Sequence, residues 1–244
     1  FDGIVITHRT DTLEETAYVL DLVLQTSIPV IVTGAMRSSN EHGSDGPYNL
    51  ISSVRVACED QSLGKGTLVV FNDEIHAAKN VTKTHTSNIA TFQSPQYGPI
   101  GIVTKRGVLF HHTPIRSDFF HVKNFSKNVV LLKAYAGMDG NLIQAATNSA
   151  DGVVIEALGQ GNLPPATVPA IKELISNGIP VVLVSRCFNG IAQDIYSYEG
   201  GGKHLKEIGA IFSNGLNGQK ARLKLMIALE NTSEPLQLQR LFLQ

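Results

Sequence analysis

Three residues of this chain have side chains that could together activate a hydroxyl group: Thr10, Asp11 and Lys83. A hydroxyl becomes a nucleophile when a base removes its proton, and a lysine amine can be that base once desolvation lowers its pKa. A neighbouring carboxylate would hold the amine in place and set its charge. Spacing alone favours a plainer interpretation, in which Thr10 and Asp11 cap a helix and Lys83 is a solvated loop charge.

Three polar loops would have to bring these residues together. They cover residues 8–12, 34–46 and 72–87. Each is expected to follow a strand, and in open α/β sheets ligands bind beyond the carboxyl ends of the strands. The first loop carries Thr10 and Asp11 where a strand meets a helix, and the third carries Lys83.

Alternating strand and helix patterns supply the frame for these loops. Apolar β-branched runs alternate with amphipathic helical spacing, which predicts βαβ units and a parallel sheet. The predicted strands are 3–7, 29–33 and 67–72, and the predicted helices are 12–25 and 47–60. Residues 73–99 are polar and predicted to be irregular, and 103–109 is predicted to be a small hairpin.

A second series of the same kind follows residues 114–128, which lose apolar periodicity and carry Arg116, Asp118, Lys123 and Lys127. We interpret this stretch as an interdomain linker. The predicted strands are 129–134, 152–157, 179–184 and 208–212, and the predicted helices are 139–149, 165–176, 218–230 and 234–242. The fold class is therefore α/β, with two α/β domains of mainly parallel sheets. They cover 1–113, with the first strands lacking, and 129–244.

Composition excludes several classes of function. The net charge is −1 with a pI of about 6.8, so bulk charge recruits neither nucleic acid nor an anionic membrane. The longest apolar runs have the length of strands, far short of the roughly 20 residues that span a bilayer. Two cysteines, Cys58 and Cys187, are expected to be reduced packing residues.

The chain begins with Phe1 and runs directly into a strand-like segment, so we expect residues to precede it in the native protein. The cytoplasm is the expected compartment, although a secretory leader would lie outside the printed sequence.

Several ordered motifs resemble those of the bacterial-type L-asparaginase/glutaminase family. Residues 8–16, His-Arg-Thr-Asp-Thr-Leu-Glu-Glu-Thr, are similar to the family signature HGTDTxEET. Four further matches follow in the family's order: Gly34-Ala35-Met36-Arg37, Ser44-Asp45-Gly46-Pro47-Tyr48-Asn49-Leu50, Val81-Thr82-Lys83-Thr84 and Gly159-Gln160-Gly161-Asn162. The resemblance spans essentially the whole chain.

The resemblance implies hydrolysis of the side-chain amide of L-asparagine, and of L-glutamine as a further candidate, through a threonine acyl-enzyme. Thr10, Asp11 and Lys83 match the family's catalytic triad, and Asp11 also matches the carboxylate that binds the substrate's α-amino group. Asn162 matches a residue that reaches a neighbouring subunit's site, and Glu199 is the candidate for that site's acidic residue. The family uses no metal or cofactor. A homodimer or homotetramer with shared sites is therefore expected, without nucleic acid or membrane partners.

Two departures from the family pattern are evident. The signature TGGTI, which holds the family's primary nucleophilic threonine, would precede Phe1, so a protein beginning at Phe1 is expected to lack activity. Arg9 stands where the family has glycine, which permits close backbone approach or an unusual φ. A bulky cation there could perturb substrate access or Lys83.

Two other functions remain open at this point. The amidase subunit of a tRNA-dependent amidotransferase shares these motifs, but it requires an extra N-terminal domain and a stable heterologous partner. A degenerate amino-acid-binding protein, with its chemistry spoiled by Arg9, would bind ligand without releasing ammonia.

Overall fold

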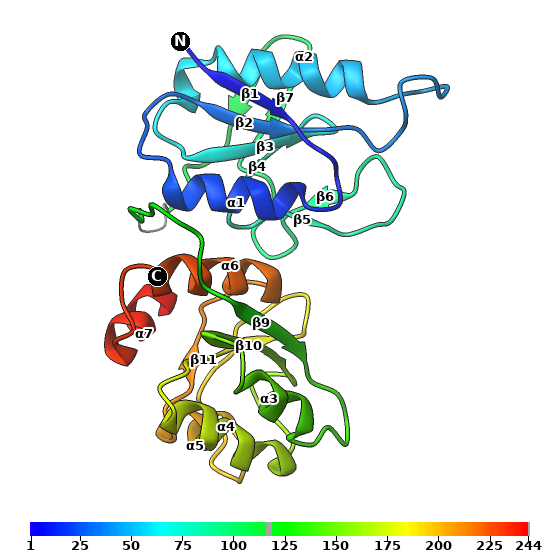
Figure 1. Ribbon diagram of the computed structural model, residues 1–244. Helices are drawn as coiled ribbons and strands as arrows, with labels where there is room; N and C mark the ends of the chain where they lie inside the picture. Colours follow the sequence, from blue (N-terminus) through cyan, green and yellow to red (C-terminus); the bar gives the residue numbers. More distant parts are fainter. Residues whose placement is uncertain (116–118, 244) are drawn as a thin grey trace. The chain divides into compact units, whose positions relative to one another are not determined.

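The computed structural model describes residues 1–115 and 119–243. The chain divides into two compact units, Phe1–Phe119 and Phe120–Gln244 (Figure 1). Each unit contains a sheet with helices packed on it, so the expected α/β class is confirmed. The division falls inside the predicted linker 114–128, of which Arg116 and Asp118 lie outside the described residues.

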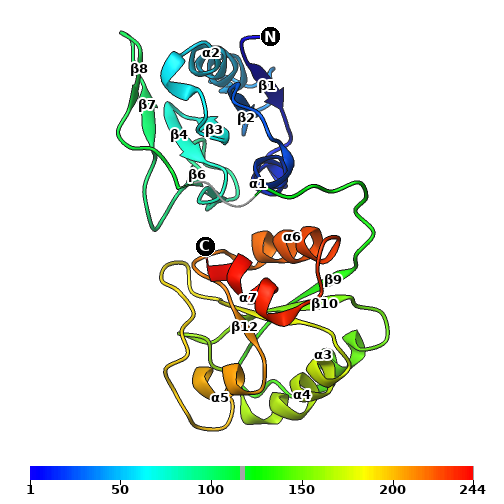
Figure 2. The ribbon, with the colours of Figure 1, turned by 90° about the vertical axis from the view of Figure 1, so that its left-hand side faces the viewer.

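Unit 1 is built on a six-stranded sheet with the order β1-β2-β3-β4-β7-β8. The strands are β1 (Ile4–Thr7), β2 (Val30–Thr33), β3 (Thr67–Phe71), β4 (Glu74–Ala77), β7 (Gly101–Val103) and β8 (Val108–Phe110). The first three are parallel, and the others are antiparallel. The β7–β8 hairpin forms the edge opposite β1 (Figure 2).

Helices α1 (Leu13–Val23) and α2 (Gly46–Ala57) cover opposite faces of this sheet (Figure 1). Alternate side chains of β2 show the two faces: Ile31 packs in the cluster with Val56 of α2, and Val32 packs with Leu13 of α1. Strands covered on both faces consist of continuous apolar runs, which is why β2 and β3 were recognisable from sequence. A short 3-10 helix (Asp60–Ser62) follows α2.

Residues 73–99 are more regular than predicted. They contain β4 and a separate two-stranded sheet, β5 (Thr82–Lys83) with β6 (Phe92–Gln93). Asn72 and Asp73 have φ of 49° and 65°, and Phe71 pairs with Glu74 across them. Two consecutive positive φ values with Asn and Asp fit the tight turn that joins antiparallel strands. The expectation of an irregular segment was therefore wrong for β4.

Unit 2 is built on a four-stranded parallel sheet with the order β12-β11-β10-β9. The strands are β9 (Val129–Lys133), β10 (Gly152–Ala157), β11 (Val181–Ser185) and β12 (Ile211–Phe212). The helices are α3 (Asn141–Ala146), α4 (Val168–Ser176), α5 (Gly202–Glu207), α6 (Gly218–Leu229) and α7 (Pro235–Leu243), with a 3-10 turn at Pro165–Thr167.

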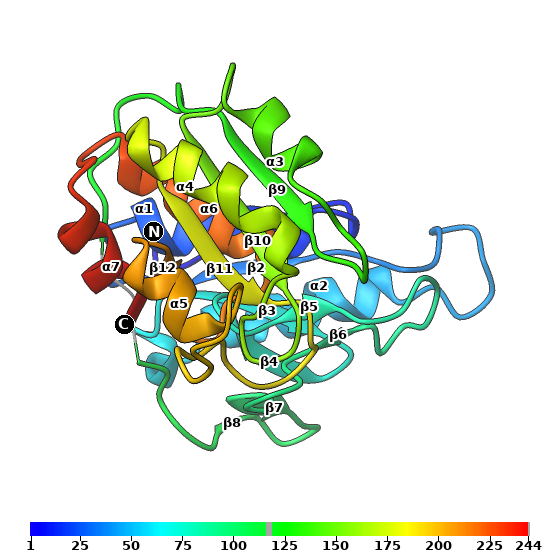
Figure 3. The ribbon, with the colours of Figure 1, turned by 90° about the horizontal axis from the view of Figure 1, so that it is seen from below.

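The helices of unit 2 also lie on both faces of its sheet. Helices α3 and α4 lie in front of β9–β11 in Figure 3, whereas α6 packs on the opposite face. Lys224, a fully buried lysine of α6, donates to the carbonyl of Leu241 and lies 5.5 Å from the centre of the Phe242 ring. These contacts attach the last helix, α7, to α6.

Cys58 and Cys187 are both free and exposed. The expectation that they are reduced fits the structure, but the expectation that they are packing residues was wrong. Both follow regular elements, Cys58 at the end of α2 and Cys187 after β11, where the chain turns to the surface. Among the described residues, no helix is both long and apolar enough to cross a lipid bilayer.

Candidate active site

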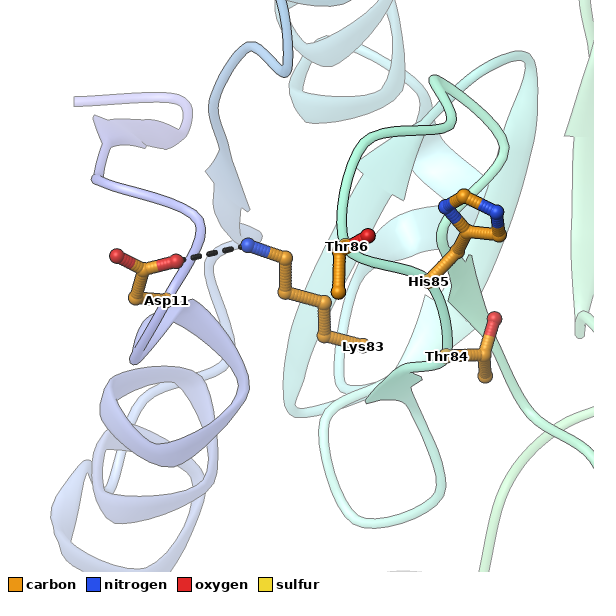
Figure 4. A pocket seen from close by; sticks show the side chains of 5 residues that line it. All are labelled: Asp11, Lys83, Thr84, His85 and Thr86. Atoms are coloured by element: carbon orange, nitrogen blue, oxygen red, sulfur yellow. Dashed lines mark hydrogen bonds and ion pairs between the residues drawn. The ribbon is translucent and has the colours of Figure 1, made fainter.

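The structure brings Thr10, Asp11 and Lys83 together. Lys83 Nζ donates one hydrogen bond to Thr10 Oγ1 at 3.0 Å and a second to Asp11 Oδ1 at 2.8 Å. Figure 4 shows the extended Lys83 side chain pointing from β5 to the turn that carries Asp11. The Lys83 side chain is 17% exposed, whereas that of Asp11 is 89% exposed. The amine is therefore largely enclosed, and the carboxylate remains open to a ligand.

His8 shapes the turn between β1 and α1. Its Nδ1 lies 2.7 Å from the Arg9 carbonyl oxygen, and its Nε2 lies 3.0 Å from Thr16 Oγ1. Because a carbonyl oxygen only accepts, Nδ1 donates to it, and Nε2 pairs with the threonine hydroxyl. The backbone N–H of His8 also bonds to Thr33 O at the end of β2. These bonds fix the path of the chain into Thr10 and Asp11.

The side chains of Thr10 and Asp11 do not cap α1. Thr12 is the N-cap residue, and no side-chain capping hydrogen bond is present at this described helix end. The interpretation in which Thr10 and Asp11 cap the helix was therefore wrong. Thr10 and Asp11 instead face Lys83, which lies far away in sequence, so the plainer interpretation of all three residues does not describe their contacts.

Lys83 also sets the charge state of Asp11. The hydrogen bond from Lys83, and then its positive charge, lower the pKa of Asp11 below its usual value, and Arg9 contributes further in the same direction. Asp11 is consequently a carboxylate at neutral pH. It can hold the amine of Lys83 and, on its exposed side, a second cation such as an α-ammonium group.

Two cavities flank the turn at residues 8–12. One of about 380 Å³ is lined by Asp11, Lys83, Thr84, His85 and Thr86 (Figure 4). Another, of about 640 Å³, lies beyond the ends of β1 and β2 and is lined in part by Arg9, Gly34 and Arg37. The candidate triad is therefore reachable from solvent.

Arg9 is exposed, and its backbone is not strained. The non-glycine residues with positive φ in the described chain are Asn72 and Asp73, so Arg9 takes an ordinary conformation. Its effect is therefore confined to the side chain, which lines the larger cavity and adds positive charge near Asp11. The close backbone approach occurs instead at Gly34, where a Cβ atom would lie 2.3 Å from His8 O.

Asn49 ties together the loops that follow β2 and β3. It is 2% exposed, and its side-chain amide donates to Gly34 O and to Asp45 Oδ2. Its Oδ1 accepts from the backbone N–H of Asn72. Asp45 in turn accepts from the backbone N–H groups of Met36 and Arg37, which closes the loop 34–46. The resemblance included Asn49 in a motif, but sequence reasoning assigned it no role.

Asn162 and Glu199 both lie in unit 2, on loops that run side by side. Asn162 Oδ1 accepts from Gly202 N at 3.0 Å, and Leu163 N donates to Gly200 O at 2.8 Å. Glu199 is exposed beside this junction. The structure therefore joins the loops of these two candidates. Thr10, Asp11 and Lys83 belong to unit 1.

The described part of the chain contains no group of three or more His, Cys, Asp or Glu residues that could hold a metal ion. The described site offers a hydroxyl, a carboxylate and an amine. In its ammonium form Lys83 donates to both partners. As a free amine it could accept the proton of the Thr10 hydroxyl across the same 3.0 Å contact. This arrangement suits nucleophilic attack on a carbonyl carbon.

Comparison with known proteins finds family matches in both units. The family model described as asparaginase, N-terminal, matches residues 1–116, and the glutaminase/asparaginase C-terminal domain matches residues 128–242. A probable L-asparaginase of Deinococcus radiodurans is 42% identical over 247 residues, which cover 100% of this chain and 76% of that protein.

Two further relatives are also similar over nearly the whole of this chain. L-asparaginase 2 of Escherichia coli is 37% identical over 250 residues, covering 100% of this chain and 70% of that protein. A probable periplasmic L-asparaginase of Haemophilus influenzae is 36% identical over 248 residues, covering 99% of this chain and 70% of that protein. Family matches in both units, and similarity along this whole chain, show that the chain belongs to the asparaginase family of amidohydrolases.

Proposed function

We propose that this protein hydrolyses the side-chain amide of L-asparagine to L-aspartate and ammonia, with L-glutamine as a second substrate. The observation that carries the proposal is the pair of hydrogen bonds from Lys83 Nζ, at 3.0 Å to Thr10 and 2.8 Å to Asp11. The relatives named L-asparaginase support the same substrate.

The proposed reaction is acyl transfer through a threonine. In the first step a threonine hydroxyl attacks the amide carbon, and its proton leaves through the hydrogen bond between Thr10 and Lys83. The C–N bond then breaks, and the nitrogen departs as ammonia after taking up the proton that Lys83 received. In the second step water attacks the ester carbon and returns the threonine hydroxyl, releasing the acid.

Substrate binding in this proposal begins at Asp11. Its side chain is 89% exposed and stays ionised, because Lys83 lowers its pKa, so it can bind the α-ammonium group of the amino acid. Asn162 and Glu199 are proposed to complete the site from a neighbouring subunit of a homodimer or homotetramer. Their adjacent loops in unit 2 would then enter the site as one element.

The protein expressed from its full native gene tests the proposal through ammonia release from L-asparagine and L-glutamine, followed with a coupled enzyme assay. We expect a higher kcat/KM for L-asparagine, and Thr10→Ala should remove the activity. Binding of either amino acid by calorimetry without ammonia release would contradict the proposal and favour a binding protein. Mass spectrometry after treatment with an electrophilic asparagine analogue would identify which threonine carries the acyl group.

The cytoplasm is the proposed compartment, and the exposed free thiols of Cys58 and Cys187 fit a reducing environment. One relative carries the word periplasmic in its name. Fractionation of cells that express the native gene decides between the two compartments, and protein in the periplasmic fraction would contradict the proposal.

A further inference from the structure

Glu14 is a buried carboxylate of α1 to which the proposed reaction gives no role. It is 5% exposed and lies in the first turn of the helix, close after Asp11. An acid in the first turn also interacts favourably with the helix dipole. A carboxylate so enclosed costs free energy unless hydrogen bonds compensate for the lost water. The contacts of the Glu14 side chain therefore indicate its role.

Those contacts lead directly to the lysine of the candidate triad. Glu14 Oε1 accepts a hydrogen bond from Thr82 Oγ1 at 3.0 Å and another from the backbone N–H of Lys83, also at 3.0 Å. The side chain of Lys83 extends to the turn before the same helix, where Nζ contacts Thr10 and Asp11. Glu14 thus holds the backbone of the residue whose amine completes the triad.

The segment that carries Lys83 needs such an attachment. Strand β5 has two residues and pairs with the two-residue β6 in a sheet separate from the six-stranded one. Short two-stranded pairs are only marginally stable without further packing. Val81 and Phe92 pack with Leu13 in the core, which sets the approximate place of the segment. Apolar packing is non-directional, however, whereas the hydrogen bonds of Glu14 fix distance and orientation.

We propose that Glu14 is a positioning residue that holds Lys83 Nζ within hydrogen-bond reach of Thr10 and Asp11. Its effect on turnover rests on the proposed function, but its effect on the geometry of Lys83 does not. Two hydrogen bonds meet at one oxygen of Glu14, which restrains the β5 backbone in both distance and direction. A shift of the catalytic group by about 1 Å can cost about 100-fold in rate.

Three variants separate positioning from general stability. Glu14→Ala removes both hydrogen bonds, whereas Glu14→Gln keeps an oxygen acceptor for Thr82 and the Lys83 backbone. Glu15→Ala is the matched control, because it removes a carboxylate of the same helix turn from a half-buried side chain. We expect kcat for L-asparagine to fall about 100-fold in Glu14→Ala with KM within about threefold. Glu14→Gln should recover most of the loss, and Glu15→Ala should stay near wild type.

The second readout does not depend on activity. The carboxyl carbon of Asp11, followed by NMR from pH 2 to 7, reports the hydrogen bond from Lys83, which lowers the pKa of Asp11. In Glu14→Ala that pKa should return toward its ordinary value of 3.8, and in Glu14→Gln and Glu15→Ala it should stay low. An unchanged Asp11 titration in folded Glu14→Ala would overturn the proposal. An inactive wild type with the expected titrations would instead reject the proposed function and keep the positioning role.

Circular dichroism establishes whether each variant is folded. Should Glu14→Ala fail to fold, Thr82→Val removes one of the two hydrogen bonds and conserves side-chain volume. The same two readouts then apply, with an expected fall in kcat of about tenfold and a partial rise in the pKa of Asp11. A purely structural role of Glu14 would give a different result. Thr82→Val and Glu14→Gln would then keep the wild-type kcat and the wild-type pKa of Asp11, and Glu14→Ala would only lose stability.

Discussion

Lys83 Nζ donates a hydrogen bond of 3.0 Å to Thr10 Oγ1 across 73 positions of the sequence. The two residues come from different elements, since Lys83 ends the short strand β5 and Thr10 lies in the turn before α1. Asp11 accepts from the same ammonium group at 2.8 Å, so one amine connects a hydroxyl to a carboxylate. Removal of this amine should therefore abolish the reaction and leave the protein folded.

Lys83→Met is expected to abolish amide hydrolysis and leave the protein folded. Methionine nearly matches the aliphatic part of lysine, but it has no amine to take the proton from Thr10. Loss of a general base typically costs about 10²–10⁴-fold in rate. Steady-state ammonia release gives kcat, and Lys105→Met, an exposed lysine in the β7–β8 turn, is the control. A variant that kept more than about a third of wild-type kcat would show that the triad assignment is wrong.

Arg9→Gly is expected to raise kcat/KM for L-asparagine. The substitution removes bulk from the wall of the 640 Å³ cavity and a positive charge near Asp11, the carboxylate proposed to bind the cationic α-ammonium group. Because Arg9 has ordinary backbone angles, Arg9→Ala should give most of the same gain, which separates the side chain from backbone freedom. Arg106→Gly, at an exposed turn, is the control. A fall in activity in both Arg9 variants would make the arginine functional and reject the degenerate-protein alternative.

The regular core was predictable from sequence because its signal is local. Strand β10 was predicted at its observed bounds, Gly152–Ala157, since burial on both faces gives a continuous apolar run. Helix α5 was missed, because six residues that begin with glycine show little periodicity. Strand β12 was predicted at 208–212 but covers Ile211–Phe212, as α5 and its C-terminal turn occupy the preceding residues.

The candidate site was only partly predictable, because contacts between residues far apart in sequence leave no local signal. Thr10 and Asp11 are adjacent to a strand end, which sequence periodicity can locate. Lys83 was a candidate from its side chain, but spacing alone favoured a solvated loop charge, and the family resemblance was needed to favour a catalytic role. Its place beside Thr10 and Asp11 depends on pairing between β5 and β6 and on contacts with α1. Glu14 and Asn49 were given no role in the site. Buried polar side chains break the apolar pattern without showing which distant group they contact.

Asn49→Ala is expected to destabilise unit 1 more than the loss of such a small side chain would suggest. The substitution removes the hydrogen bonds of Asn49 with Gly34 O, Asp45 Oδ2 and the N–H of Asn72, and each such bond contributes about 0.5–1.5 kcal/mol. We expect the free energy of unfolding, measured in urea, to fall by about 2–4 kcal/mol. Asn40→Ala, at an exposed position of the same loop 34–46, should change it by less than about 0.5 kcal/mol. Equal effects of the two substitutions would show that Asn49 does not join the loops.

Glu74 should make stability depend on pH in the acid range. A hydrogen bond from His76 is the main cause that lowers the pKa of Glu74 below its ordinary value of 4.5. A carboxyl with a depressed pKa stabilises the folded state above its ordinary value, and this contribution is lost as pH falls through the native value. Glu74→Gln should therefore lower the thermal midpoint at pH 6 but not at pH 2. Glu207→Gln, at an exposed site on α5, is the control, and a difference of equal size at both pH values would contradict the linkage.

The proposed sharing of sites between subunits predicts activity from a mixture of two inactive variants. Thr10→Ala damages the unit 1 part of a site, and Asn162→Asp damages the unit 2 part while keeping an oxygen acceptor for Gly202 N. If each site combines unit 1 of one chain with unit 2 of another, a hybrid dimer contains one intact site. Random mixing makes about half of the dimers hybrids, so about a quarter of wild-type activity should return.

Subunit exchange has to be measured in the same sample for this result to be decisive. Two different affinity tags and mild denaturant allow the hybrids to be purified and their activity assayed separately. Each single variant must first be shown to fold and to have less than about 1% of wild-type activity, a loss within the range expected for removing a catalytic contact. Inactive hybrids after confirmed exchange would mean that each chain completes its own site with its own Asn162. Activity in the hybrids alone would show that Thr10 of one chain works with Asn162 of its partner.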